Sequence, residues 1–268
     1  MTLFMTIMIF VLGLSVGSFI NMAVFRTAIK YKLKKNLKSK VKNINKNRSY
    51  CDFCGKQLKW YENVPVISWL IQGGRSKCCH NPLPPWYPIV ELGTGVLFLL
   101  NFKFSTHLSG QVFSFCSIFN YLILGILIFS LVFDLKYMIL PDGANYLLIV
   151  LALILLIGRE NYWPYLWSGI GSGLFFLILN RIKIRKSEAM GMGDVKYTLF
   201  MGLFLGFPGT IIAGYLAFVV GALVSVILLV LKKVKRTDPI PFGPFLILGT
   251  GVAWAWGEKI INMVNLIR

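Results

Sequence analysis

The sequence is poor in acidic side chains and in long polar segments. It has 10 Asp and Glu against 28 Lys and Arg, and 56% of its 268 residues are hydrophobic. A mean hydropathy of +0.70 excludes an ordinary soluble domain. The one sizeable polar segment is 26–86. The chain is therefore predicted to be an integral membrane protein.

The first apolar stretch, 3–25, lacks a basic n-region and is too long for a signal-peptide core, so we expect a retained helix. Apolar runs of about 20 residues predict an all-α polytopic protein with about eight transmembrane helices. Two runs are short and are expected to be partly re-entrant or to lie beside a wet cavity. The predicted spans are 3–25, 87–104, 112–133, 143–158 (short), 163–181, 194–206 (short), 208–231 and 241–260.

The predicted organisation is a first transmembrane helix (1–25), a loop domain (26–86) and a membrane core of about seven helices (87–268). With the N-terminus outside, 24 of the 28 basic residues lie on the inner side, as the positive-inside rule requires. The stretch 26–48 holds ten basic and no acidic residues. We expect it to lie on anionic lipid headgroups as a solvated loop, and we expect no nucleic-acid partner.

The loop domain is too small to build much of a core alone, so we expect its cysteines to cross-link and stabilise it. Cys51 and Cys54 form a CxxC pair, and Cys78, Cys79 and His80 follow it. A reducing cytoplasm makes disulfides the weaker interpretation. The spacing predicts a structural zinc site with Cys51, Cys54 and Cys79 as ligands and Cys78 or His80 as the fourth. Reduced cysteines without a metal remain the alternative.

Two of the ten acidic residues lie at the ends of apolar runs, Asp134 at the end of one and Asp194 at the start of another. A carboxylate at membrane depth costs several kcal/mol unless it is paired or hydrated, which predicts a function. Close carboxylates share a proton, so one can activate a water while the other protonates a scissile carbonyl. This chemistry predicts an aspartic endopeptidase without a catalytic metal. A proton-coupled transporter that uses the same acids is the alternative.

Neighbouring residues support that prediction. Gly191 and Gly193 leave the backbone before the second aspartate open to a substrate strand. Asp142 follows Pro141, and either caps the next helix or replaces the earlier aspartate in catalysis. Lys196 either pairs with a carboxylate or extends to the interface.

Ordered motifs along nearly the whole chain resemble those of the type IV prepilin peptidases, membrane aspartic proteases of the GxGD class. The matching segments are GSFIN at 17–21 with Arg26, the CxxC at 51–54, ENVPVIS at 62–68, YPIVEL at 87–92, the DxxxxxxPD segment at 134–142, GMGD at 191–194 and PFGPF at 241–245. The resemblance implies that Asp134 and Asp194 are the catalytic pair and that the protein lies in the bacterial inner membrane. It implies a type IV prepilin or pseudopilin substrate, from a pilus, competence or secretion system. Cleavage would follow a glycine that ends a basic leader, at the cytoplasmic membrane face.

The resemblance also implies N-methylation of the new amino terminus with S-adenosylmethionine. Two departures weaken the zinc and methylation inferences: Ser76 stands where the family has a cysteine, and Trp86 where it often has arginine. Glu91, in YPIVEL, either contacts the new amino terminus or the methyl donor, or is an interfacial acid paired with Lys or Arg. A zinc-bearing scaffold without enzyme activity is a further alternative, but such a scaffold needs neither aspartate.

Overall fold

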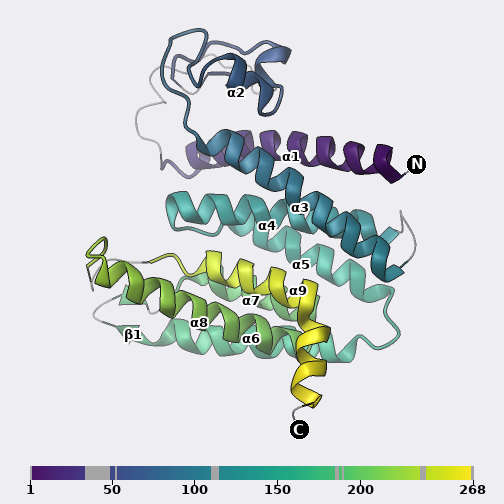
Figure 1. Ribbon diagram of the computed structural model, residues 1–268. Helices are drawn as coiled ribbons and strands as arrows, with labels where there is room; N and C mark the ends of the chain where they lie inside the picture. The colour runs from purple at the N-terminus through teal and green to yellow at the C-terminus, as the bar shows by residue number, and fades with distance from the viewer. Residues whose placement is uncertain are drawn as a thin grey trace. The chain divides into compact units, whose positions relative to one another are not determined.

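The computed structural model describes residues 2–33, 49–51, 53–109, 115–184, 187–188, 190–235 and 240–266. This part of the chain is mostly helical (Figure 1), with one ladder between two-residue strands, β1 (Lys183–Ile184) and β2 (Ser187–Glu188), and isolated bridges at Tyr50–Gln57 and Arg75–Pro82. Each range predicted to span the membrane carries a helix. These are α1 (Thr2–Lys30), α3 (Trp86–Ser109), α4 (Phe115–Tyr137), α5 (Asp142–Ile157), α6 (Trp163–Arg181), α7 (Met192–Leu205), α8 (Gly209–Val230) and α9 (Gly243–Leu266). The all-α prediction is thereby confirmed, whereas most of the Lys-rich stretch, 34–48, lies outside the described residues.

Among the described residues, three helices are long and apolar enough to cross a membrane, at Leu3–Lys30, Ser117–Tyr137 and Gly209–Val230. The eight-span count stays a prediction. With 16 and 14 residues, α5 and α7 reach only about 24 and 21 Å at a rise of 1.5 Å per residue. The hydrocarbon core is about 30 Å thick, so neither helix crosses it unaided.

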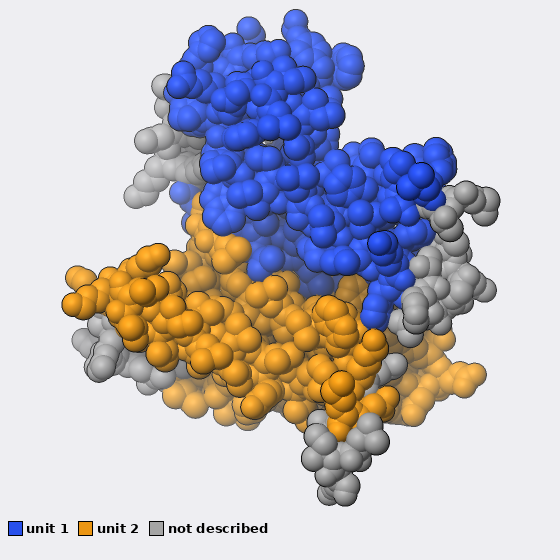
Figure 2. Space-filling view, viewed as in Figure 1, with its two compact units in different colours: residues 1–132 blue, residues 133–268 orange. Residues whose placement is uncertain are grey.

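The chain divides into two compact units, residues 1–132 and 133–268, coloured separately in Figure 2. In the first unit α1 and α3 pack antiparallel along a seam of small residues. A Cβ on Gly13 would lie 2.8 Å from Gly95 Cα, and one on Gly17 would lie 2.7 Å from Glu91 Cα. The loop between these helices contains the 3₁₀ turn η1 (Trp60–Asn63) and the short helix α2 (Ile67–Ile71). The predicted division at 25 and 86 stays a prediction.

In the second unit α7 is the central helix, because it contacts α5, α6, α8 and α9. Its Tyr197, Phe200 and Met201 side chains are completely buried. The hydroxyl of Tyr197 also donates a hydrogen bond to Thr250 Oγ1 at 2.9 Å, which ties α7 to α9. The last residues of α4, from Phe133 onward, belong to this unit as well. The ends of α4 and α7 therefore lie within one compact unit.

Candidate active site and metal centre

Asp134 lies in the last turn of α4 and is 4% exposed. Its carboxylate accepts a hydrogen bond from the backbone N–H of Gly243, the first residue of α9. Free N–H groups and the helix dipole both favour negative charge at a helix N-terminus. The start of α9 therefore compensates part of the cost of burying this carboxylate.

Asp194 lies in the first turn of α7, where the dipole again favours a carboxylate. Its side chain accepts a hydrogen bond from the backbone N–H of Gly191, and its own N–H donates to the Gly191 carbonyl at 3.1 Å. The charge of Asp134 acts directly on Asp194. The structure thus brings together two acids that are 60 positions apart in the sequence.

The loop that follows α4 packs against two glycines near these acids. A Cβ on Gly193 would lie 3.0 Å from Leu140 Cβ, and one on Gly243 would lie 3.1 Å from Leu140 Cδ1 and would overlap the Asp134 carboxylate. Neither glycine has a positive φ, so space and not backbone conformation requires them. Gly191 differs, because it is exposed and a Cβ there would lie 3.4 Å from Asp194 Oδ2, an ordinary contact distance.

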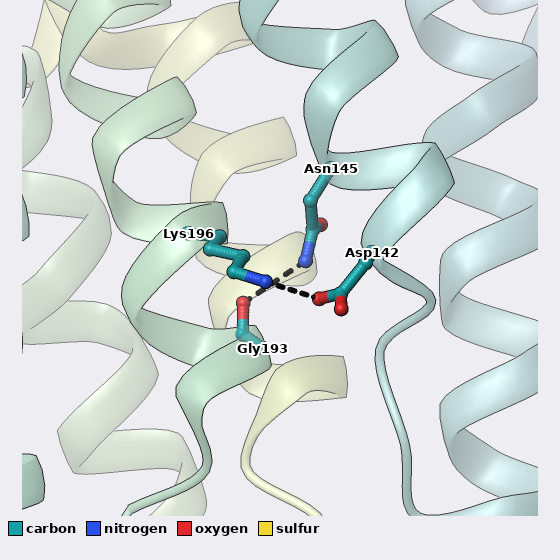
Figure 3. Close-up of polar contacts among 4 residues, drawn as sticks. All are labelled: Asp142, Asn145, Gly193 and Lys196. Atoms are coloured by element: carbon teal, nitrogen blue, oxygen red, sulfur yellow. Dashed lines mark hydrogen bonds and ion pairs between the residues drawn. The ribbon is translucent and has the colours of Figure 1, made fainter.

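Asp142 forms an ion pair with Lys196, with Oδ1 2.7 Å from Nζ (Figure 3). The prediction that Asp142 caps α5 is wrong: Pro141 is the N-cap, and Asp142 is the first helical residue with no side-chain capping bond. The Lys196 ammonium also lies over the Tyr146 ring, 4.9 Å from its centroid. Of the two alternatives for Lys196, pairing with a carboxylate is the observed one.

Asn145 was not predicted from the sequence, although it stands out as an amide in an otherwise apolar helix. It is fully buried on α5, and its Nδ2 donates to the Gly193 carbonyl at 3.0 Å, as Figure 3 shows. Its Oδ1 has no hydrogen-bond partner among the described residues. Asn145 therefore anchors the backbone next to Asp194 and still has one free acceptor.

The loop of the first unit brings Cys51, Cys54, Cys78 and Cys79 together, with all four sulfurs within 4.8 Å of one another. The Cys51–Cys79 sulfur pair is 3.7 Å apart and the Cys54–Cys78 pair 3.2 Å. Zinc–sulfur bonds of 2.3 Å place neighbouring sulfurs of a tetrahedral site about 3.8 Å apart. The donor set therefore fits a structural zinc ion. Cys78 completes it, and His80 is outside the cluster.

Two turns of the same construction carry these ligands. In the first, Cys51 N donates to Lys56 O and Gly55 N to Cys51 O; in the second, Ser76 N donates to Asn81 O and His80 N to Ser76 O. Ser76 therefore occupies the position that Cys51 has in the first turn. His80 corresponds to Gly55, and both have positive φ (56° and 74°).

Position 76 has no sulfur, and Cys78, two residues further along the chain, supplies the fourth sulfur of the cluster. The buried Ser76 hydroxyl lies 3.1 Å from Cys78 Sγ and 3.4 Å from Cys51 Sγ. The Asn81 backbone N–H lowers the pKa of Cys79 to about 6, whereas burial raises the pKa of the Cys78 thiol to about 12. A coordinated thiol is deprotonated, so a metal would hold Cys78 as a thiolate despite this raised pKa.

Glu91, the predicted supporting acid of the first unit, is 7% exposed. It accepts hydrogen bonds from the Val66 backbone N–H, at 2.7 Å, and from the side chains of Ser18 and Asn21. All three of these partners are uncharged. Among the described contacts, Glu91 is therefore hydrogen-bonded to neutral groups and is not paired with Lys or Arg.

Two family models match the chain. The Bacterial Peptidase A24 N-terminal domain matches residues 11–104, and the Type IV leader peptidase family matches residues 121–226. No solved structure matches.

Several curated proteins are similar over nearly their whole length and carry the name prepilin leader peptidase/N-methyltransferase. The protein from Stutzerimonas stutzeri is 29% identical, over 93% of this chain and 90% of its own. The protein from Pseudomonas aeruginosa is 28% identical, over 93% of this chain and 89% of its own. The protein from Legionella pneumophila is 29% identical, over 97% of this chain and 94% of its own. With both domain models matched in order, this chain belongs to the type IV prepilin leader peptidase family.

Proposed function

We propose that the protein removes the basic leader of type IV prepilins or pseudopilins, with Asp134 and Asp194 as its catalytic pair. One observation carries the proposal: the charge of Asp134 acts on the Asp194 carboxylate, while the backbone N–H groups of Gly243 and Gly191, at the starts of α9 and α7, donate to Asp134 and Asp194 respectively. That is the arrangement that an aspartic protease requires. The family and the names of the relatives support the same reaction.

In the proposed mechanism one carboxylate is ionised and the other is protonated, because two close like charges do not ionise together. The ionised acid takes a proton from a bound water, which attacks the scissile carbonyl carbon. The protonated acid donates to the carbonyl oxygen, and a proton then passes to the leaving amine. The two titrations belong to the pair and not to either residue.

The surrounding residues position the pair in this proposal. The exposed backbone of Gly191 is where the substrate strand approaches. Asn145 and the Lys196–Asp142 ion pair hold the first turn of α7 on α5. Asp142 then has a supporting role and is not the first catalytic acid.

The proposed location is the bacterial inner membrane, with the N-terminus outside and residues 26–86 in the cytoplasm. Cleavage would then occur after a glycine at the cytoplasmic face, with the apolar helix of the substrate still in the bilayer. The Lys-rich stretch 26–48 would contact anionic lipid headgroups. No nucleic-acid partner is proposed.

Zinc has a structural role in the proposal, held by Cys51, Cys54, Cys78 and Cys79. Four ligand bonds would stabilise a loop domain whose few short elements bury little apolar surface. The names of the relatives include an N-methyltransferase activity, which we extend to this protein. S-adenosylmethionine is the methyl donor that this activity implies.

Co-expression with a prepilin, with leader removal followed on a gel, tests the proposal. Asp134→Asn and Asp194→Asn should each slow cleavage by at least about 100-fold, since each removes a proton-transfer group. Asp142→Asn is the matched control and should cleave within a few-fold of the wild-type rate. Processing that survives Asp194→Asn would refute the assignment. A proton-coupled transporter would lose transport in these variants and yield no cleaved product in any of them.

A further inference from the structure

An apolar pocket of about 690 Å³ lies within the second unit, between α6 and α8 and against α7. Neither the two acids nor the clustered cysteines contribute to its wall. On α6 the wall runs from Pro164 to Phe176, and on α8 and the turn before it from Phe207 to Phe218. Its residues are spaced three and four apart, so each helix contributes a single face. At 1.5 Å per residue the wall of α6 is about 18 Å long.

The two helices run in the same direction along this pocket. Ser168 Oγ donates to Thr210 Oγ1 at 2.7 Å. Eight positions further along both helices, Phe176 stacks on Phe218, with the ring centroids 6.0 Å apart. The residues between these two contacts face each other across an elongated groove.

One end of the groove adjoins the candidate active site. The rings of Phe176 and Phe218 both contact the ring of Phe242, with centroids 6.4 and 5.1 Å apart. Phe242 directly precedes Gly243, whose backbone N–H donates to the Asp134 carboxylate. A chain that leaves the acidic pair can therefore continue over this aromatic cluster into the groove.

The groove wall is apolar although it contains three hydroxyl groups. Ser168 donates to Thr210, Thr210 donates to the Gly206 carbonyl at 2.8 Å, and Ser172 donates to the Thr198 carbonyl at 2.8 Å. Each hydroxyl hydrogen is thus already used within the protein. No residue of the wall carries a charge. An apolar occupant therefore loses no polar contact when it enters the groove.

Two glycines in the groove wall have no explanation within the described chain. A Cβ on Gly169 would lie 2.7 Å from Leu203 Cγ, so the packing of α6 on α7 requires that glycine. A Cβ on Gly171 or on Gly214 would meet nothing within 4 Å, and both residues line the groove. Small residues let the backbones of membrane helices approach closely. These two glycines leave room for a helix that is not part of the described chain.

We propose that this groove binds the apolar helix of the prepilin or pseudopilin substrate, the segment that follows the cleaved bond. The inference rests on the proposed peptidase function and adds where the membrane-embedded part of the substrate is held. The groove starts beside the acidic pair and extends about 18 Å from it, which matches about 12 residues of a helix. A helix that crosses the bilayer has about 20 residues, so more than half of it would lie in the groove.

The wall favours a helix over a phospholipid. It contains no cation for a phosphate headgroup, and a flexible acyl chain gains nothing specific from glycine. A substrate helix gains from both features of the groove. Its backbone approaches Gly171 and Gly214, and its apolar side chains, repeated three and four residues apart, pack against the aromatic rings of the wall.

Filling the groove tests the inference in proteoliposomes with a full-length prepilin. Gly171→Leu and Gly214→Leu each add a side chain in open space and improve helix propensity, so the fold should be retained. Each should raise KM for prepilin cleavage by at least about 10-fold and change kcat little, because binding is lost and the acidic pair is untouched. Gly93→Leu, at an exposed glycine of α3 whose Cβ also meets nothing, is the matched control and should keep the wild-type KM. Unchanged KM in both groove variants would overturn the inference.

Photo-crosslinking tests the unfilled groove directly and does not require cleavage. The photoreactive residue p-benzoylphenylalanine replaces Tyr215, a 68% exposed residue of the groove wall, in protein that carries Asp194→Asn. It should form an adduct with the prepilin, and Gly171→Leu should reduce that adduct. The same residue in place of Trp256, 51% exposed on α9 and outside the groove, is the control and should form none.

The adducts distinguish the possible occupants. Adducts at position 215 with lipid alone, or with a second copy of this chain, would overturn the inference, as would equal prepilin adducts at both positions. The peptidase proposal is tested separately by leader removal with the wild type. Cleavage without a prepilin adduct at position 215 contradicts only the groove assignment, and an adduct without cleavage contradicts only the peptidase assignment.

Discussion

Gly243→Ala isolates the contribution of the α9 start to the acidic pair. The added Cβ would lie 3.2 Å from Asp134 Cγ, closer still to one carboxylate oxygen, and 3.1 Å from Leu140 Cδ1. The φ of Gly243 is not in the left-handed region, so alanine adopts the backbone without strain and the effect is one of space. The Asp134 side chain must then move away from the backbone N–H of residue 243, which donates a hydrogen bond to it.

The expected cost follows from that displacement. Relief of the overlap requires a shift of about 1 Å, and a misplacement of that size costs roughly 100-fold in rate. Overpacking of the buried site should also lower the free energy of unfolding by about 1–3 kcal/mol. The assay is the initial rate of leader removal in detergent or proteoliposomes, with thermal unfolding measured on the same preparations.

Gly251→Ala is the matched control on the same helix, because a Cβ there meets nothing within 4 Å. It should keep the wild-type rate and gain up to about 1 kcal/mol in stability from the better helix propensity of alanine. Wild-type cleavage by Gly243→Ala would refute the reasoning that Asp134 depends on this contact. A loss in rate that only tracked unfolding would do so as well.

Three further predictions concern the residues around the two sites. Asn145→Ala removes a buried hydrogen bond to the α7 backbone and should lower stability by about 1–3 kcal/mol and slow cleavage, whereas a variant with unchanged cleavage would contradict its anchoring role. Lys196→Met breaks the exposed ion pair with Asp142 and should cost no more than about 1 kcal/mol by chemical denaturation; a larger loss would mean that the pair is desolvated in the membrane. Cys78→Ser should lower the zinc content measured by atomic emission, and the added change Ser76→Cys should restore it, because position 76 is the first ligand position of the second turn; failure of the rescue would contradict the equivalence of the two turns.

The helices were largely predictable from the sequence. Apolar runs located the eight long helices of the described residues, because each run is a local pattern that is present in the chain before it folds. A predicted membrane span does not give the end of its helix: α1 continues to Lys30, past position 25, since lysine and arginine are good helix formers and do not stop a helix. The predicted capping role of Asp142 was wrong for a different reason. A local sequence pattern does not show that Lys196, 54 positions away, pairs with the Asp142 carboxylate.

Motifs and composition alone therefore determined the class of protein, its helices, the two candidate acids and three of the four clustered cysteines, whereas the structure decided for Cys78 over His80 as the fourth. Tertiary structure alone decided which groups surround those residues: Gly243 against Asp134, Asn145 against the α7 backbone, Ser76 in place of a ligand, and neutral donors around Glu91. The contacting residues are far apart in the sequence: Glu91 is 25 positions from Val66, Asn145 is 48 from Gly193, and Asp134 is more than a hundred from Gly243. Their contacts arise where helix ends converge in space, and such long-range packing leaves no period or spacing along the chain that a local pattern can reveal.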